Sequence, residues 1–300
     1  GEKIQVESGT TVLEAARQKG IKIPTFCYHE MLSSPGACRL CIVEIEGMKN
    51  LPASCVTQAT QGMVIYTHSE KVIEARKTLL ELILANHPLD CLTCEKSGDC
   101  KLQDYCYEYG VAGSSFNGET HDFELDNTNP YIVRDNNKCI LCGKCVRACS
   151  EIKGANILDF SERGFHTKVT PAFDTSFAQS ECVYCHNCVA VCPVGALMPK
   201  ELAGKGRHWQ MKKEPVTCTF CEAGCEFVIY RKNDRVVGVV AKGAAPGRPL
   251  CLKGRLGLNF VHNPDCVEKP LLKVDGEFIP VEWVEALGLG QVFQKLKHVE

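Results

Sequence analysis

The spacing of the cysteines constrains this chain more than any other feature of its sequence. All but two of the 21 cysteines fall into groups of three or four, and a histidine completes the group of three. In chain order, the groups are Cys27, Cys38, Cys41 and Cys55; His87, Cys91, Cys94 and Cys100; Cys139, Cys142, Cys145 and Cys149; Cys182, Cys185, Cys188 and Cys192; and Cys218, Cys221, Cys225 and Cys251. Only Cys106 and Cys266 are left over, so the chain has ligands for five four-ligand centres.

Disulfide bonds, structural zinc and iron–sulfur clusters all use many cysteines. Disulfides are typical of short chains in oxidising compartments, whereas this chain has 300 residues, an odd number of cysteines and no visible signal peptide. Structural zinc usually takes two separated Cys-x-x-Cys pairs. The compact runs at 139–149 and 182–192 have instead the spacing of iron–sulfur ligands. The sequence therefore indicates a chain of iron–sulfur clusters that carries single electrons.

Charge and hydropathy exclude several other classes of function. The net charge is −2 and the pI about 6.5, which argues against nucleic acid or an anionic membrane as a partner. The longest apolar run, at 79–85, is too short to span a bilayer. Because the chain starts at Gly1 without Met, we expect native residues upstream.

Hydrophobic periodicity predicts a mixed α+β chain. We expect strands at 4–6, 42–45 and 63–66 around a helix at 11–19. A second helix is predicted at 68–86, with Thr67 and Glu70 as a capping box and Pro88 ending it. The polar segments 111–129 and 199–215 are expected to be flexible linkers.

Two halves of an internal repeat, 138–150 and 181–197, each carry the same four-cysteine run. Between them, a hairpin is predicted at 157–169. A second hairpin, at 227–240, turns at Asn233-Asp234 inside the last cysteine group.

The second group leaves a choice of ligand. A histidine at a helix end, such as His87, often caps the last carbonyls instead of binding metal. Three cysteines that lack a fourth ligand favour ligation by His87. Cys106 is the rival fourth ligand, and its alternative role is that of a small buried hydrophobe.

The spacing of the first two groups resembles a known family. Cys27, Cys38, Cys41 and Cys55 (the N-terminal set) resemble the [2Fe–2S] ligands of the large iron–sulfur subunit of complex I and of related hydrogenases and formate dehydrogenases. This resemblance implies a β-grasp ferredoxin-like fold. His87, Cys91, Cys94 and Cys100 (the histidine set) resemble the [4Fe–4S] domain of the same families, which uses one histidine and three cysteines.

The repeat resembles a bacterial two-cluster ferredoxin, in which the fourth cysteine of each run ligates the other cluster. The resemblance implies a first repeat set and a second repeat set with exchanged fourth ligands. The first repeat set is Cys139, Cys142, Cys145 and Cys192, and the second is Cys182, Cys185, Cys188 and Cys149. Pro193 follows Cys192 as usual, whereas Ser150 after Cys149 departs from the pattern.

The last group, Cys218, Cys221, Cys225 and Cys251 (the C-terminal set), resembles the [4Fe–4S] domain of molybdopterin oxidoreductases. In those enzymes the lysine at the position of Lys253 lies between cluster and pterin, so Lys253 is either such a relay or a surface lysine. The implied domains are 1–70, [2Fe–2S]; 71–130, histidine-ligated; 131–205, two-cluster ferredoxin; 214–268, molybdopterin-oxidoreductase type; and 269–300, a tail or the start of a missing domain.

As a whole, the chain looks most like the N-terminal region of the catalytic subunit of cytoplasmic, NAD(P)-linked, electron-bifurcating formate dehydrogenases of anaerobes. The expected cofactors are one [2Fe–2S] and four [4Fe–4S] clusters. No Gly-x-Gly-x-x-Gly or P-loop motif is found, so we expect no flavin, no hydride site and no catalytic residue in this chain.

The resemblance implies a hetero-oligomeric complex with an NAD(P)H-binding flavoprotein that carries FMN and iron–sulfur clusters, and with ferredoxin or another redox subunit. We favour a relay subunit that ends near residue 300. The alternative is the electron-transfer front of a longer molybdenum or tungsten formate dehydrogenase. A non-redox scaffold is disfavoured because such a protein rarely needs five clusters.

Overall fold

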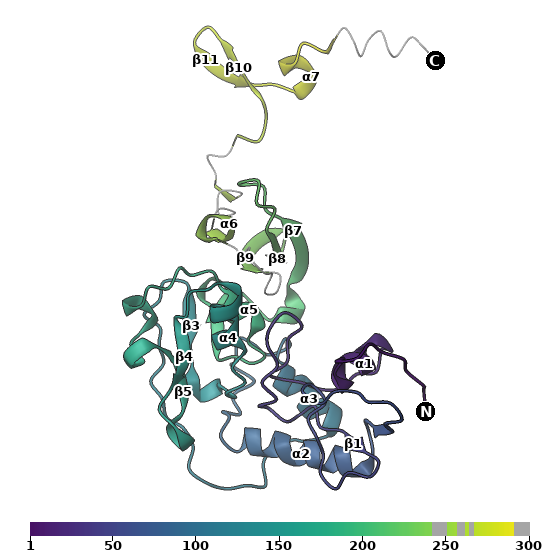
Figure 1. Cartoon of the computed structure of the whole chain (residues 1–300). Coiled ribbons are helices and arrows are strands. Elements are labelled where there is room, and N and C mark those ends of the chain that lie inside the picture. The colour runs from purple at the N-terminus through teal and green to yellow at the C-terminus, as the bar shows by residue number, and fades with distance from the viewer. Residues whose placement is uncertain (242–250, 257–261, 264–266, 291–300) are drawn as a thin grey trace. The chain divides into compact units, whose positions relative to one another are not determined.

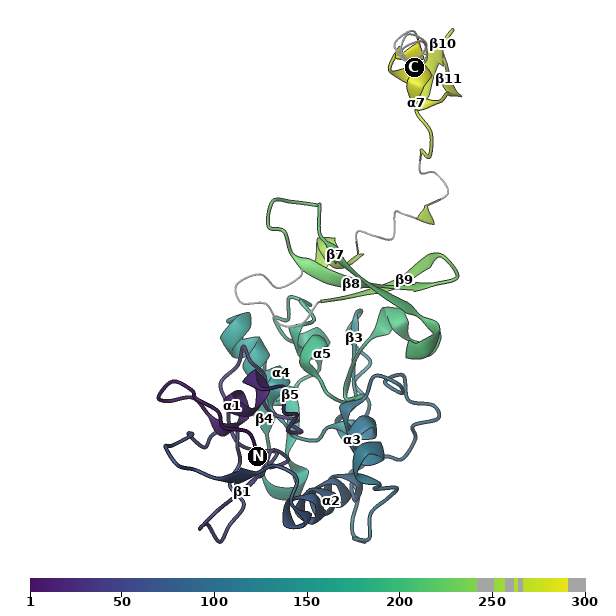
Figure 2. The ribbon, with the colours of Figure 1, turned by 90° about the vertical axis from the view of Figure 1, so that its right-hand side faces the viewer.

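The computed structural model describes residues 1–241, 251–256, 262–263 and 267–290 (Figures 1 and 2). Contacts divide the chain into two units, Gly1–Leu256 and Gly257–Glu300. The first unit contains all five ligand groups. Its elements are short, and several small sheets share the space with helices, which makes it an α+β chain as predicted.

The N-terminal part of the first unit contains α1 (Val12–Gln18), β1 (Glu44–Ile45) and β2 (Ile65–Tyr66). The predicted helix is confirmed, and Thr11 and Glu14 form a capping box at its start. β1 and β2 pair antiparallel, as two of the expected strands. The strand predicted at 4–6 is wrong: these residues form no strand, because an alternating pattern makes one only where a partner pairs with its backbone.

The next part contains α2 (Glu70–Leu84) and α3 (Lys101–Tyr109), which contact each other. The α2 prediction is confirmed, but its cap is Ser69, whose hydroxyl accepts from the Val72 amide; the predicted capping box is wrong. The Thr67 hydroxyl contacts the His68 ring instead. α3 was not expected from the sequence, although Gly110, in a left-handed conformation, ends it in the usual way.

Arg76 ties α2 to the loop that carries two cysteines of the N-terminal set. It is fully buried, and it donates to the carbonyls of Leu40 and Ile42 at 3.2 and 2.7 Å and to the Tyr109 hydroxyl at 2.9 Å. Three partners from two segments satisfy one guanidinium, which offers five donors in a rigid plane. This side chain therefore crosslinks the first two cysteine-bearing parts.

The repeat is built from α4 (Lys144–Arg147), continued by a π-helical turn at Ala148–Ile152, and α5 (Asn187–Val191). The two helices contact each other. β3 (Ile132–Arg134) pairs with β6 (Leu197–Pro199), and the hairpin of β4 (Leu158–Ser161) and β5 (Lys168–Pro171) confirms the predicted insertion. Gly143 and His186 occupy equivalent positions and share a left-handed backbone, with φ of 67° and 62°.

The segment 111–129 has no helix or strand, but it is anchored. The Asp126 carboxylate lies 2.9 Å from the Arg134 guanidinium, and both side chains are buried. Burial alone would raise the pKa of Asp126, yet hydrogen bonds from Thr128, Arg134 and the Phe177 amide outweigh it and lower that pKa to about 2. The expected linker is thus tied to the repeat by a buried ion pair.

The prediction of a flexible linker at 199–215 is wrong for its last residues, 212–215, which belong to a strand. β7 (Lys212–Thr217) starts inside it and forms a three-stranded antiparallel sheet with β8 (Glu226–Lys232) and β9 (Arg235–Ala241). The hairpin of β8 and β9 confirms the one predicted from the sequence. Lys212 and Lys213 made the start of β7 look like a polar linker in the sequence. Charged residues are common in a strand at the edge of a sheet, as β7 is.

The first unit ends in α6 (Leu252–Leu256), which contacts β9. The second unit contains the hairpin of β10 (Leu271–Val274) and β11 (Glu277–Pro280), followed by α7 (Trp283–Ala286). Its two-residue turn, Asp275-Gly276, has positive φ at both positions, the usual choice for a tight hairpin. Among the described residues, no helix has the length and apolar character that crossing a membrane requires.

We predict that Arg76→Ala lowers the free energy of unfolding by about 3 kcal/mol, because it leaves buried carbonyls without a donor. The urea midpoint of the cluster-loaded protein, followed by circular dichroism, measures this change. Lys77→Ala is the matched control: Lys77 is a neighbouring, more exposed residue whose ion pair with Glu74 contributes little. Equal midpoints for the two variants would contradict the crosslinking role of Arg76.

Candidate iron–sulfur centres

The N-terminal set converges between α1 and the β1 strand region. Cys27, Cys41 and Cys55 are buried, and Cys38 is partly buried. The backbone amides of Phe26 and Cys27 each lie 3.4 Å from the Cys38 sulfur. Hydrogen bonds from Cys38 and Cys55 lower the pKa of Cys27 to about 2, and a hydrogen bond with Cys55 lowers that of Cys41 to about 6. The same hydrogen bonds raise the pKa of Cys38 and Cys55, so the four sulfurs lie close to one another, as the ligands of one centre must.

His87 follows the end of α2. Its Nδ1 lies 2.9 Å from the Pro88 carbonyl oxygen, and its Nε2 is buried without a hydrogen-bond partner among the described residues. A carbonyl only accepts, so Nδ1 carries the proton and Nε2 presents a lone pair. Metal-bound histidines show this pattern, in which the second ring nitrogen donates to a fixed acceptor. Burial also lowers the pKa of His87, which favours the neutral ring.

The cysteines of the histidine set lie on the loop between α2 and α3. Cys91 is exposed, whereas Cys94 and Cys100 are partly buried. Cys106 lies within electrostatic reach of this set: burial raises its pKa to about 11, and the charges of Cys100 and Cys91 contribute to that rise. Its side chain packs against the main hydrophobic cluster, as expected of a small buried hydrophobe.

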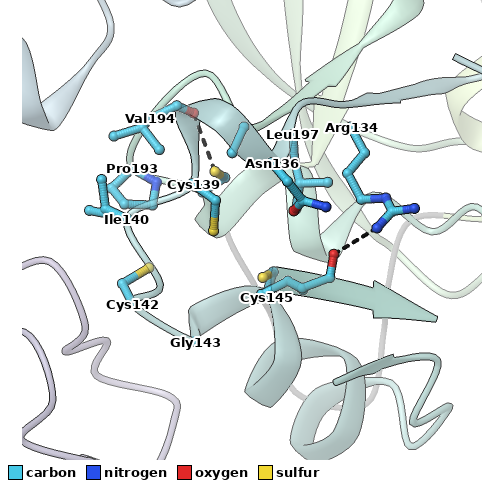
Figure 3. Close-up of a pocket in the computed structure, with 13 residues that line it drawn as sticks. Arg134, Asn136, Cys139, Ile140, Cys142, Gly143, Cys145, Pro193, Val194 and Leu197 are labelled. Carbon is cyan, nitrogen blue, oxygen red and sulfur yellow. Dashed lines mark hydrogen bonds between the residues drawn. The ribbon is translucent and has the colours of Figure 1, made fainter. Parts of the chain in front are cut away.

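The first repeat set surrounds one cavity. Cys139, Cys142, Cys145 and Cys192 all line it, together with apolar side chains such as Val169 and Leu197. Figure 3 shows the sulfurs of Cys139, Cys142 and Cys145 directed into the same space. Burial, helped by nearby thiols that include Cys192, raises the pKa of Cys139 to about 12 and that of Cys142 to about 11. The structure thus groups Cys192 with the first run.

The second repeat set is brought together in the same exchanged way. Burial raises the pKa of Cys182, Cys185 and Cys188, and the charge of Cys149 adds to the rise in all three. Cys149 therefore lies near the second run. The Tyr184 amide, 3.4 Å from the Cys182 sulfur, matches the Leu141 amide at the same distance from Cys139.

Arg147, which the sequence analysis did not single out, joins the N-terminal set to the first repeat set. Its guanidinium donates to the Cys27 carbonyl at 2.7 Å and to the Cys142 carbonyl at 3.2 Å, and it also contacts the Ser33 carbonyl. Lys144, which is half-buried, contributes a second positive charge beside Cys142. Aligning the halves of the repeat could have shown that Lys144 and Arg147 have no basic counterparts in the second half, where Asn187 and Ala190 stand.

Gly195 joins the histidine set to the first repeat set. A Cβ at this position would lie only 2.9 Å from the Cys94 sulfur, so only glycine permits this approach without displacement. The Lys101 amide also donates to the Pro193 carbonyl at 2.8 Å, and Lys138 pairs with Asp90 at 2.8 Å. The loop that follows Cys192 is therefore packed against the loop of Cys94.

The C-terminal set lies at the edge of the sheet β7–β8–β9. The Cys218 amide donates to the Cys225 carbonyl at 2.7 Å, and the loop between them carries the exposed Cys221. Cys251 stands directly before α6, where the Gly254 amide lies 3.5 Å from its sulfur. The Lys253 ammonium lies 5.9 Å from the centre of the Phe220 ring, so α6 lies beside the Cys218–Cys225 loop. The leftover Cys266 falls outside the described residues.

The donor chemistry, thiolates with one imidazole, fits iron–sulfur clusters. A multi-iron cluster is wider than a single ion, so its ligands stand around a cavity, as Cys139, Cys142, Cys145 and Cys192 do. The unpartnered Nε2 of His87 is a further sign that a bound group belongs there.

Four family models match successive parts of the chain. They are a 2Fe-2S iron-sulfur cluster binding domain at 1–70, the NADH-ubiquinone oxidoreductase-G iron-sulfur binding region at 76–115, the ferredoxin-like domain of NADH-quinone oxidoreductase subunit 3 at 129–198, and the molybdopterin oxidoreductase Fe4S4 domain at 211–263. Together they show a series of small iron–sulfur domains, as predicted from the sequence.

Curated relatives resemble most of the chain. A G-type component of the NADH-quinone oxidoreductase of Rhizobium meliloti is 40% identical over 95% of this chain and 34% of its own length. The NADPH-Fe(3+) oxidoreductase subunit alpha of Geobacter sulfurreducens is 37% identical over 96% of this chain and 33% of its own. The chain therefore spans about a third of the length of these relatives.

A solved structure resembles about two thirds of the chain. A chain of the NAD+-reducing [NiFe]-hydrogenase in the H2-reduced state is 35% identical, with a TM-score of 0.64 over 68% of this chain and 87% of that one. The five ligand groups, the four matching family models and these relatives all indicate a series of iron–sulfur domains. The chain is a multi-cluster iron–sulfur electron-transfer protein and belongs to the NADH-ubiquinone oxidoreductase-G iron–sulfur family.

Proposed function

We propose that this chain relays single electrons between an NAD(P)H-binding flavoprotein, which carries FMN and iron–sulfur clusters, and ferredoxin or a further redox subunit. Nicotinamides move two electrons as hydride, whereas iron–sulfur clusters move one, so the partner's flavin converts between them. This chain carries no flavin in the proposal, and the complex is cytoplasmic and hetero-oligomeric. Its relatives are named as components of NADH-quinone oxidoreductases and NADPH-Fe(3+) oxidoreductases, which supports this class of partner.

The observation that carries the proposal is the contact of two ligand loops with the repeat. Arg147 links the Cys27 and Cys142 carbonyls, and Gly195 brings the Cys94 loop against the loop after Cys192. Both contacts end on loops of the first repeat set. This supports the repeat as a junction where electrons from the two N-terminal parts meet, since transfer between centres requires them to be close.

We further propose that the twenty ligands hold one [2Fe–2S] and four [4Fe–4S] clusters, in domains at 1–70, 71–130, 131–205 and 214–268. In this assignment Lys253 is a relay toward a pterin cofactor where one is present. The residues of this chain supply the thiolates, the single imidazole and the basic side chains near them.

We predict roughly eighteen iron atoms per chain in anaerobically purified protein, two from one cluster and sixteen from four. Iron and acid-labile sulfide analysis measures this content, and metal analysis reports zinc in the same sample. A value near ten irons, or stoichiometric zinc, would overturn the assignment of five clusters.

His87 and Cys106 are distinguished by substitution. We predict that His87→Ala removes or converts one [4Fe–4S] signal in the EPR spectrum of the reduced protein, because a ligand is lost, and that Cys106→Ala leaves every signal in place. His68→Ala, at a histidine just before α2, is the matched control. The opposite pattern, with the signal lost in Cys106→Ala and kept in His87→Ala, would make Cys106 the fourth ligand.

We predict that Cys145→Ala in the assembled complex abolishes electron transfer from NAD(P)H to the distal acceptor, because it removes a ligand at the junction. Reduction of the partner's flavin by NAD(P)H should continue at the wild-type rate, and stopped-flow absorbance follows both steps. Distal transfer at an unchanged rate would show that electrons bypass the repeat.

A second candidate is the N-terminal part of a molybdenum or tungsten formate dehydrogenase of the NAD(P)-linked, electron-bifurcating type. The match to the molybdopterin oxidoreductase Fe4S4 domain favours it, as does Lys253 beside the C-terminal set. Molybdenum and tungsten analysis of the native protein, with an assay of formate oxidation, separates the two candidates. Absence of both metals from the active native complex would exclude the formate dehydrogenase.

A further inference from the structure

Arg255, on α6, is a buried cation, and no acidic side chain of the described residues forms an ion pair with it. Its side chain is 1% exposed, and none of its three guanidinium nitrogens has a hydrogen-bond partner among the described residues. An unpaired charge in such a place is costly, so buried arginines are normally paired and fully hydrogen-bonded. The charge of Arg255 therefore calls for a partner that is not one of the described side chains.

One acid, Glu201, lies in its neighbourhood without contacting it. Glu201 attracts Arg255, but its carboxylate accepts from the Val239 amide at 3.1 Å, and the described residues form no ion pair between the two. The Tyr131 ring, 5.1 Å from the guanidinium carbon, provides a cation–π contact. Such a contact does not satisfy donors that point away from the ring face.

Arg255 lies near the loop of the second repeat set. The Tyr131 ring that it contacts packs edge-on against Tyr184 at 5.3 Å, and Tyr184 stands between Cys182 and Cys185. Electrostatics agrees with this placement: burial raises the pKa of Cys182, and the positive charge of Arg255 opposes that rise. Burial lowers the pKa of Arg255, and Glu201, Cys185 and Cys188 oppose that lowering.

The two halves of the repeat differ in the cations beside their thiols. The first half supplies Lys144 and Arg147, while the second half has Asn187 and Ala190 at those positions. Near the second repeat set, Lys153 acts on Cys185, and Arg255 approaches from outside the repeat. An anionic cluster held by four thiolates needs compensating donors and charge in a buried site.

We propose that Arg255 is the buried counter-charge of the cluster held by the second repeat set, and that it raises the reduction potential of that cluster. This rests on the proposed ligand assignment. α6 then has two roles one turn apart: Cys251, just before it, is a ligand of the C-terminal set, and Arg255 faces the preceding cluster. Docking of the C-terminal cluster domain thereby makes its neighbour easier to reduce.

The test is an EPR-monitored redox titration of the full-length, cluster-loaded protein. Arg255→Gln should shift one [4Fe–4S] midpoint to more negative potential and leave the others unchanged, and Arg255→Lys should shift it less. The signal that moves is assigned by its loss in Cys185→Ala. Arg235→Gln, an exposed arginine on β9, is the matched control and should shift nothing.

The outcomes separate this inference from the ligand assignment. Iron content and the Cys185→Ala spectrum report whether the cluster exists, independently of Arg255. An unshifted midpoint in Arg255→Gln, with the cluster present, overturns the inference alone. If the cluster does not assemble in Arg255→Gln, its assembly in Arg255→Lys with a midpoint potential near that of the wild type supports the proposal that the cluster needs a positive charge here. If the cluster assembles in neither variant, the shape of arginine is what matters, and the proposed role of Arg255 as counter-charge is overturned.

Discussion

Each cluster requires side chains from separate loops to face one point, and in this chain arginines that are buried or half-buried between the loops hold them in place. Arg76 joins α2 to the loop of Cys38 and Cys41, Arg134 secures the segment before the repeat, and Arg147 links two ligand loops through their carbonyls. A guanidinium reaches several acceptors at once, which suits loops that have few regular backbone partners. Sheets of two strands and helices of a few residues could not fix these positions by themselves.

Because of these contacts, the cluster-bearing parts are not separate domains joined by flexible linkers. The first unit, Gly1–Leu256, includes all five ligand groups. Its main hydrophobic cluster combines Phe26, Leu80, Leu102 and Val189, residues from three different cysteine-bearing parts. The parts thus share a core that none of them is large enough to build alone.

Local signals made much of this architecture predictable. The spacing of apolar residues marks α1, the Asn233-Asp234 turn marks the hairpin of β8 and β9, and Cys-x-x-Cys spacing marks the ligand loops. The ends of the repeat pair as β3 and β6 across more than sixty residues, a contact that no local pattern encodes. For the same reason the sequence did not single out Arg147 and Arg255, whose importance comes from segments far away in the chain. The strand predicted at 4–6 is the opposite case: its alternating pattern is present, but no described residue pairs with it as a strand.

Gly195 has a consequence for the rate at which electrons cross between two parts of the molecule. With no side chain there, the Cys94 sulfur rests almost against the main chain of the loop that carries Cys192. Electron tunnelling weakens exponentially with distance, so a methyl group that pushed this contact apart would slow transfer between the two parts as well as strain their packing. The missing side chain at position 195 thus sets how closely two ligand loops can approach each other.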